Sequence, residues 1–410
     1  MIRERVQYAG AAILLVALVL AGWGASPARP LLAQGDDDPA PTLPPPAPLP
    51  EYGVFVQQCG NGVQPRGPEF AASGLIVTTF SRDGMWVVDL DRNMRYPLPN
   101  TRPCGPNCRP SPDRRYLLYV SPETATYWLM RPDGLERSSV FPFYVSELDW
   151  WDADHWLVWP TAGPPAIYPI GTLPGEVEPD RLAGFDTYAI QPGGYHGLRL
   201  VDGTGEWPFL ELIDLKTGDA LRLVEARPFV GGAYWSPGGG LLAYVGQGAF
   251  DAGVGLRGAE VFAIAPGESA AVRLTNLTGA YGAVRVTGEQ DAHALSWSPD
   301  GRYLAFWVLE IIGPDPAANV GHAVIHVLDT QTGKTVVYCG FASQATGEPR
   351  LPALVWSPDG QYIAFGVDEP DDERPALLMV LDTLTGDYTV VSEGMYRAYG
   401  TYDPVMWGLR

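Results

Sequence analysis

The side chains that could do chemistry in this chain of 410 residues are few and scattered. The sequence contains no Gly-x-Ser-x-Gly nucleophile elbow, Walker loop or His-Glu-x-x-His motif. His322 and His326 look like a metal-binding pair, but they lie on an expected strand, roughly 13 Å apart at about 3.3 Å per residue. We therefore expect two half-exposed histidines on an outer strand. We predict no catalytic residue, metal or cofactor, and His155, His196 and His293 form no motif either.

The four cysteines are compatible with two disulfides if the chain is exported. Cys104 and Cys108 are close enough in sequence to close a small loop. Cys59 and Cys339 would then join the N-terminal segment to the wall of the domain. This is the favoured pairing among three connectivities. Half of a metal site at Cys104 and Cys108 is the weaker alternative, because no second pair has suitable spacing.

A repeated turn organises the elements that carry these residues. Trp297-Ser-Pro-Asp-Gly301 and Trp356-Ser-Pro-Asp-Gly360 each precede an aromatic-rich strand, and 235–239 is a weaker copy. Proline presets φ for the turn, and glycine supplies the left-handed residue that follows. A repeat at this spacing predicts a β-propeller. The frame positions are 110, 150, 190, 235, 297, 356 and 407, which gives seven blades.

A second turn, Asp-x-x-Thr-Gly, supports this count at 214–218, 329–333 and 382–386. The frame residue Trp407 begins a blade just before the last residue of the sequence. We therefore predict an all-β, seven-bladed propeller of four-stranded antiparallel blades. In the closing blade, a strand within 404–410 joins strands at 75–79, 85–90 and 95–98, which leaves no open sheet edge.

The repeats resemble the TolB-type, WD-like propeller repeat, whose hallmark is the segment Trp-Ser-Pro-Asp-Gly-x-x-Leu-Ala-Phe. The resemblance covers about residues 74 to 410 and is strong at 235–245, 297–306 and 356–365. It implies a propeller fold. TolB carries an additional N-terminal α/β domain and prolyl oligopeptidase relatives carry a hydrolase domain, so neither a partner nor an activity is carried over.

The short turns follow the first and third strand of each blade, so the long connections share the opposite face. Loops on one side of a rigid scaffold are where binding residues usually lie. Counting back from each frame position gives a polar mouth of the central channel on that face. The ligand-binding candidates at this mouth are Asp186, Tyr188, His293, Tyr402 and Asp403.

The N-terminal region reads as a targeting segment. Residues 1–35 have a basic start and an uncharged apolar stretch at 9–25, typical of a signal peptide or a retained membrane anchor. Residues 36–50 form a proline-rich linker, and 51–410 form the propeller. The expected location is extracytoplasmic: secreted, periplasmic or at the cell surface.

Charge limits the range of partners. The formal net charge of −20 argues against nucleic acid, whose phosphates need clustered lysine and arginine. We expect a monomeric, non-enzymatic propeller that binds a protein, peptide or glycan through its long-loop face. The alternative is a propeller enzyme, hydrolase or polysaccharide-lyase-like, with its site at the channel mouth. Lyases of this type use several histidines there, whereas only His293 occupies such a position.

Overall fold

The computed structural model describes most of the chain from residue 53 onward. The predicted signal or anchor (1–35) and linker (36–50) lie outside the described residues. No helix in the described part is both long and apolar enough to cross a membrane. The described ranges are 53–81, 84–103, 108–140, 145–172, 176–183, 189–201, 209–225, 229–250, 257–266, 268, 270–282, 284–287, 295–313, 320–344, 351–367, 376–395 and 404–410.

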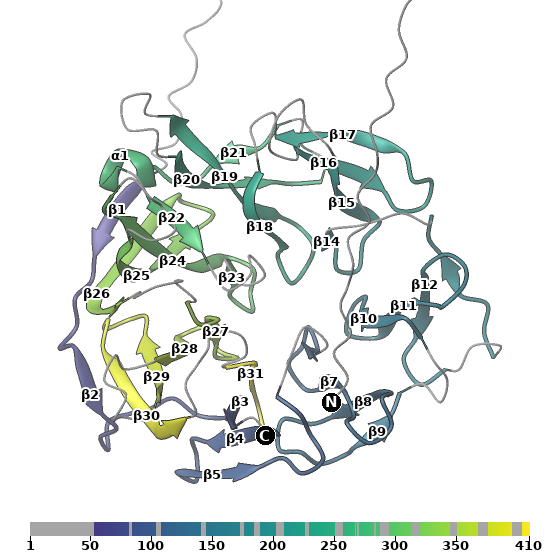
Figure 1. Ribbon diagram of the computed structural model, residues 1–410, viewed down its shortest axis with the longest axis horizontal. Coiled ribbons are helices and arrows are strands. Elements are labelled where there is room, and N and C mark those ends of the chain that lie inside the picture. Colours follow the sequence, from purple (N-terminus) through teal and green to yellow (C-terminus); the bar gives the residue numbers. More distant parts are fainter. Residues whose placement is uncertain are drawn as a thin grey trace, which may run out of the picture. The chain divides into compact units, whose positions relative to one another are not determined.

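Seven antiparallel sheets follow one another round a ring, which confirms the predicted seven-bladed propeller (Figure 1). Each blade runs from an innermost to an outermost strand. Blade 1 contains β31 (Met406–Gly408), β3 (Leu75–Ser81), β4 (Gly84–Asp89) and β5 (Met94–Pro97); blade 2 contains β6 (Arg109–Pro110), β7 (Leu117–Val120), β8 (Tyr127–Met130) and β9 (Ser138–Ser139); blade 3 contains β10 (Glu147–Trp150), β11 (His155–Trp159), β12 (Ala166–Pro169) and β13 (Asp180–Arg181).

The later blades are longer-stranded. Blade 4 contains β14 (Ala189–Ile190), β15 (His196–Val201), β16 (Phe209–Asp214) and β17 (Ala220–Glu225); blade 5 contains β18 (Phe229–Trp235), β19 (Leu242–Phe250), β20 (Arg257–Ile264) and β21 (Val272–Arg273); blade 6 contains β22 (Val284–Thr287), β23 (Ser296–Trp297), β24 (Tyr303–Ile311), β25 (Val320–Asp329) and β26 (Lys334–Gln344); blade 7 contains β27 (Val355–Trp356), β28 (Tyr362–Val367), β29 (Ala376–Asp382) and β30 (Tyr388–Met395). A short helix, α1 (Leu277–Tyr281), connects blades 5 and 6.

The repeated turn works through its side chains as well as its backbone. In blade 6 the Tyr303 amide donates to Ser298 Oγ at 2.8 Å, and the Arg302 amide donates to Asp300 Oδ1 at 3.1 Å. Gly301 takes the left-handed φ of 69°. The same serine and aspartate contacts recur at Ser357 and Asp359. The turn is therefore fixed by local chemistry, which is why it could be identified from sequence.

The frame tryptophans connect neighbouring blades. Trp297 Nε1 donates to the carbonyl of Tyr234 at 3.1 Å, and Trp356 Nε1 donates to that of Ser296 at 3.0 Å. Each acceptor immediately precedes the frame residue of the preceding blade. Because buried polar groups need partners, this bond ties the position of one blade to that of the next.

The ring closes as predicted, through the C-terminal strand. Ile76 of β3 pairs with Trp407 of β31 in an antiparallel register, and Trp407 is fully buried. Trp407 Nε1 donates to the carbonyl of Ser73 at 2.9 Å. Blade 1 thus takes its innermost strand from the end of the chain and its other three from the beginning.

Arg114 lies across this closure. It stands at a turn position that is glycine in blades 5, 6 and 7, and has a φ of 58°. Its guanidinium Nη1 reaches the carbonyl of Trp356 in blade 7 at 3.1 Å. Its own carbonyl would lie 2.9 Å from a Cβ added at Gly408, so the end of β31 fits closely beneath the Arg114 backbone.

An N-terminal strap, residues 53–65, adds a strand to the outer edge of two blades. β1 (Val54–Gln57) pairs in parallel with β26, and β2 (Val63–Pro65) pairs in parallel with β30. Between them the chain crosses the blade boundary so closely that a Cβ at Gly60 would lie 2.5 Å from the Gly386 carbonyl oxygen. Blades 6 and 7 therefore exceed the four strands predicted for each blade.

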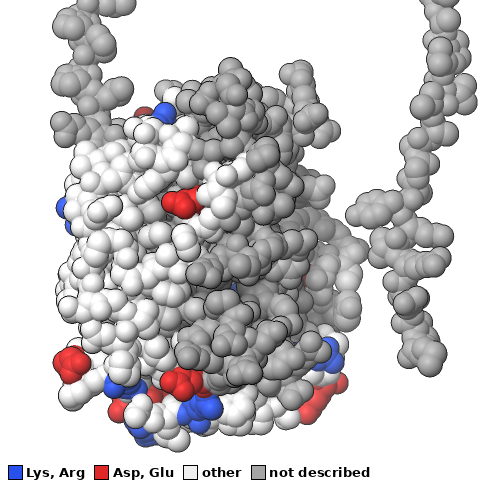
Figure 2. Space-filling model, turned by 60° about the vertical axis from the view of Figure 1, so that its left-hand side comes forward, with Lys and Arg blue, Asp and Glu red and all other residues white. Residues whose placement is uncertain are grey.

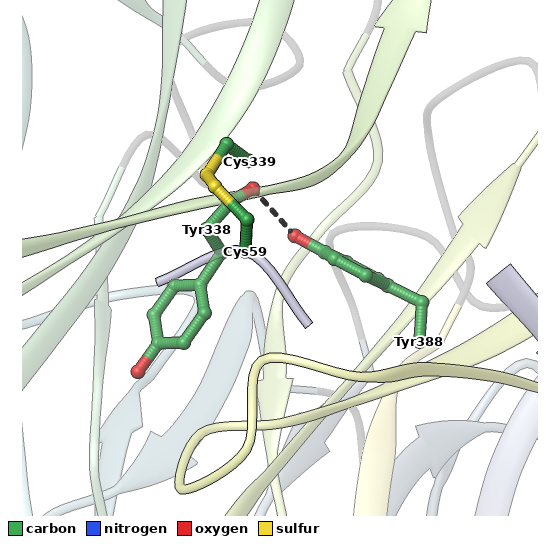
Figure 3. The surroundings of a disulfide bond; sticks show 4 residues. All are labelled: Cys59, Tyr338, Cys339 and Tyr388. Atoms are coloured by element: carbon green, nitrogen blue, oxygen red, sulfur yellow. Dashed lines mark hydrogen bonds between the residues drawn. A yellow bond between two sulfur atoms is a disulfide. The ribbon is translucent and has the colours of Figure 1, made fainter. Parts of the chain in front are cut away.

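A disulfide fixes this strap at the boundary of blades 6 and 7. Cys59 is bonded to Cys339, 280 residues later in the sequence, which is the pairing the sequence favoured (Figure 3). Beside it, the Tyr388 hydroxyl of blade 7 donates to the carbonyl of Tyr338 in blade 6 at 2.9 Å. Cys108 is also disulfide-bonded, whereas Cys104 lies outside the described residues.

Candidate functional site

The residues predicted at the channel mouth lie outside the described part of the chain. This holds for all of Asp186, Tyr188, His293, Tyr402 and Asp403. Most of the long connections on that face are outside it too. The long-loop binding face and the channel-mouth enzyme site therefore stay predictions.

A groove of about 910 Å³ opens between blades 7 and 1, next to the seam where the ring closes. A volume of this size is within the range of ligand sites in proteins. The groove is formed by the strap, by the outer strands of blade 1 and by the outer strands of blade 7. Its lining consists of Val63, Gln64, Pro65, Arg66, Val88, Asn93, Met94, Arg95, Leu377, Val390, Val391, Ser392 and Glu393.

One wall of the groove is an incompletely paired strand edge. β2 pairs with β30 only from Tyr388 to Val390, where Pro65 is the last partner. β30 itself continues to Met395. Proline has no amide hydrogen, so the ladder cannot continue through it as a donor. The edge of β30 beyond Val390 is left without a strand partner among the described residues.

Arg95 fills part of this edge from the neighbouring blade. Its guanidinium Nη1 donates to the carbonyl of Glu393 and contacts Ser392 Oγ at 3.3 Å. The carbonyl of Glu393 therefore points away from blade 7, toward the groove. A side chain, rather than a strand, satisfies it.

Arg66 stands at the other side of the groove, directly after β2. Its guanidinium donates to Asn93 Oδ1 at 2.8 Å and to the carbonyl of Leu90, and lies 5.1 Å from the ring centre of Phe70. These acceptors are all uncharged. Within the described residues, no carboxylate forms an ion pair with Arg66.

The floor of the groove is apolar and rigidly supported. Val88 belongs to a core cluster that fills the space between blades 7 and 1, together with the fully buried Leu378 and Trp407, and the partly buried Val391 packs against this cluster. Among the described residues in view in Figure 2, charged side chains gather toward the lower end of the face. The lining of the groove thus combines this apolar floor with the guanidinium groups of Arg66 and Arg95 and the carboxylate of Glu393.

A second cluster surrounds His326, and here the expectation of a half-exposed histidine was wrong. His322 is exposed as expected, but His326 is only 2% exposed. Phe55 of the strap and Tyr281 of α1 cover it, with ring centres 6.4 Å and 5.6 Å from the imidazole, and Phe306 stacks on it at 5.8 Å. Sequence reasoning missed this because it did not predict β1, which carries Phe55.

The hydrogen bonds of His326 fix a neutral tautomer. Nδ1 lies 3.0 Å from the carbonyl of Val324, which can only accept, so Nδ1 carries the hydrogen. Nε2 accepts from the Tyr281 hydroxyl at 3.1 Å. Burial lowers the pKa of His326 to about 4. Its neighbours are aromatic and offer no opening to a ligand, so this cluster is part of the core.

The described residues contain no group of three or more histidine, cysteine, aspartate or glutamate side chains that could hold a metal ion. The site that they do define is the groove, which sequence reasoning missed. The one available signal was Cys59, which correctly indicated that the N-terminal segment lies on the wall of the domain.

No protein-family model matches the chain, and no curated protein matches it. Solved structures do. A puromycin-hydrolyzing peptidase from Mycobacterium tuberculosis is 12% identical, with a TM-score of 0.49. The match covers 78% of this chain and 53% of the peptidase. Oligogalacturonate lyase from Vibrio parahaemolyticus is 13% identical, with a TM-score of 0.47 and coverages of 78% and 87%.

TolB from Acinetobacter baumannii is 16% identical over 77% of this chain, with a TM-score of 0.40. The present chain spans 62% of that protein. A propeller is a scaffold that many functions share, so these likenesses assign no activity. The seven sheets of this chain by themselves define its propeller fold.

Proposed function

We propose that this protein is a non-enzymatic, extracytoplasmic binding propeller, and that a partner polypeptide binds in the groove between blades 7 and 1. The observation that carries the proposal is the groove itself, with its apolar floor and its charged rim. Interfaces commonly combine an apolar centre with a polar rim. The support from the interblade core favours a preformed site, which lowers the ordering cost of binding.

The Cys59–Cys339 disulfide supports the extracytoplasmic location. Disulfides persist in oxidising compartments and are rare in the cytosol. Export would be directed by residues 1–35, either as a cleaved signal or as a retained anchor. The proposal holds for both.

Two variants with matched positions test the groove. Val63 on β2 lines the groove, whereas Val54 on β1 belongs to the same strap but does not line the groove. The two valines are similarly exposed, at 46% and 41%. Full-length protein, Val63→Glu and Val54→Glu are immobilised and exposed to the extracytoplasmic fraction of the source cells. Captured polypeptides are compared by quantitative mass spectrometry.

We expect at least one polypeptide to be captured by the wild-type protein and by Val54→Glu, and to be reduced at least tenfold with Val63→Glu. A carboxylate on this wall would have to lose its water when a partner binds, which would account for the loss. Partners held equally by all three proteins would contradict the groove and favour the long-loop face. Thermal unfolding of the variants shows whether both retain the fold.

A further inference from the structure

We propose that the occupant of the groove is an extended segment of the partner, which adds as a strand along β30 beyond Val390 and places an acidic side chain next to Arg66. This inference rests on the proposed function and specifies its ligand. Strand addition gives affinity through backbone hydrogen bonds and specificity through alternate side chains.

The chain itself provides the precedent for this mode. Its own strap adds one strand to the outer edge of blade 6 and another to that of blade 7, both in parallel. The outer edges of these blades therefore accept an additional strand beside the strands of the blade itself. In blade 7 the addition is incomplete, because β2 stops at Pro65 while β30 continues to Met395.

The part of β30 whose outer edge has no strand partner among the described residues has the dimensions of a peptide site. The stretch from Val391 to Met395 is about 16 Å long at the usual rise per residue. The carbonyl of Glu393 faces the groove and accepts from Arg95 of blade 1. An incoming backbone amide would take the same acceptor, and the guanidinium of Arg95 would turn toward the ligand.

Charge selects the side chain that this segment carries. Arg66 contacts only uncharged acceptors among the described residues, so a carboxylate would be its first full ionic partner there. Arg95 lines the same groove. An ion pair at an exposed rim contributes more to specificity than to affinity. A segment with aspartate or glutamate should therefore be preferred over its amide counterpart by a modest factor.

The probe is a displayed library of random ten-residue peptides, selected on the full-length protein and depleted on Val63→Glu. The enriched peptides are then synthesised with an N-methyl group at one amide at a time. We expect two or more alternating amides at which methylation weakens binding at least tenfold, because only every second amide of a strand faces its neighbour. Methylation at the amides between them should change binding less than threefold.

The acidic preference is tested in a double-mutant cycle. Replacing the peptide carboxylate by its amide should weaken binding about three- to tenfold to wild-type protein, and have no further effect on Arg66→Gln. Equal tolerance of every methylated position would overturn strand addition, as would the absence of groove-dependent peptides. If replacing the peptide carboxylate by its amide weakens binding to Arg66→Gln as much as it weakens binding to the wild-type protein, the role of Arg66 is overturned. The partner-capture experiment tests independently whether the groove is a binding site, so failure of strand addition can be distinguished from failure of the proposed function.

Discussion

Buried among aromatic rings, His326 keeps a neutral imidazole at pH values where an exposed histidine gains a proton. Its pKa in the folded protein is about 4, against an ordinary value of 6.5. The neutral form is therefore favoured by folding, and the unfolded chain binds the proton more readily. Linkage then requires the stabilising contribution to be complete above pH 6.5 and to be lost as the pH falls toward 4.

The free energy of unfolding should consequently fall by about 2 kcal/mol from this residue alone between pH 7.5 and pH 5. His326→Gln removes the titrating group, so the pH dependence of the variant should be shallower by that amount. Urea unfolding at the two pH values measures it. His322→Gln, an exposed change on the same strand, is the matched control and should unfold with the wild-type pH dependence.

At the scale of the element, the strap explains features that no single residue does. It places Phe55 over His326 at one end and forms the wall of the groove with Val63 and Pro65 at the other. Two short parallel pairings hold it, and exposed valines on both strands show that little of it is buried. The disulfide between Cys59 and Cys339 is therefore central to its position.

Replacing both cysteines, as Cys59→Ser with Cys339→Ser, should lower the free energy of unfolding by about 2–5 kcal/mol. The bond closes a long loop, since 280 residues separate its cysteines, and its removal releases chain entropy in the unfolded state. Denaturant unfolding under oxidising conditions gives the value. An unchanged midpoint would mean that the two parallel pairings alone hold the strap.

The whole molecule depends on one seam, because each blade packs only on its neighbours. β31 brings Trp407 into the core between blades 7 and 1, and Arg114 reaches over its end from blade 2 to blade 7. Removing the strand would open the inner edge of blade 1 and expose two packed faces. The penalty should therefore appear in the stability of the entire propeller.

A truncation that ends at residue 403 is expected to destabilise the protein by at least 3–5 kcal/mol, the usual cost of losing a large buried aromatic side chain. A truncation that removes only Leu409 and Arg410 is the control. It eliminates the ion pair of Arg410 with Asp89 but keeps Trp407, so its effect should be clearly smaller. Differential scanning calorimetry compares both truncations with the full chain. A melting temperature of the variant ending at residue 403 that equals that of the full chain would contradict the closure.

Seven blades, the frame residues at their starts and the closure by Trp407 could all be predicted from sequence. These features depend on turns whose chemistry is local: proline and glycine set the backbone, and serine and aspartate bond to amides within five residues. Local interactions recur with the repeat, so each copy supports the others. The Cys59–Cys339 pairing could also be favoured from sequence, because four cysteines allow only three connectivities.

The strap, the burial of His326 and the groove could not be predicted from sequence and are seen only in the folded protein. Each depends on segments far apart in sequence: β1 lies on β26, Phe55 covers a histidine 271 positions away, and the groove joins residues 63–66, 93–95 and 390–393. The strap segment has no repeat signal, and its strands form only because blades 6 and 7 offer an edge to pair with. Such pairing depends on which edges the finished ring leaves open, and that is settled only when the blades have packed.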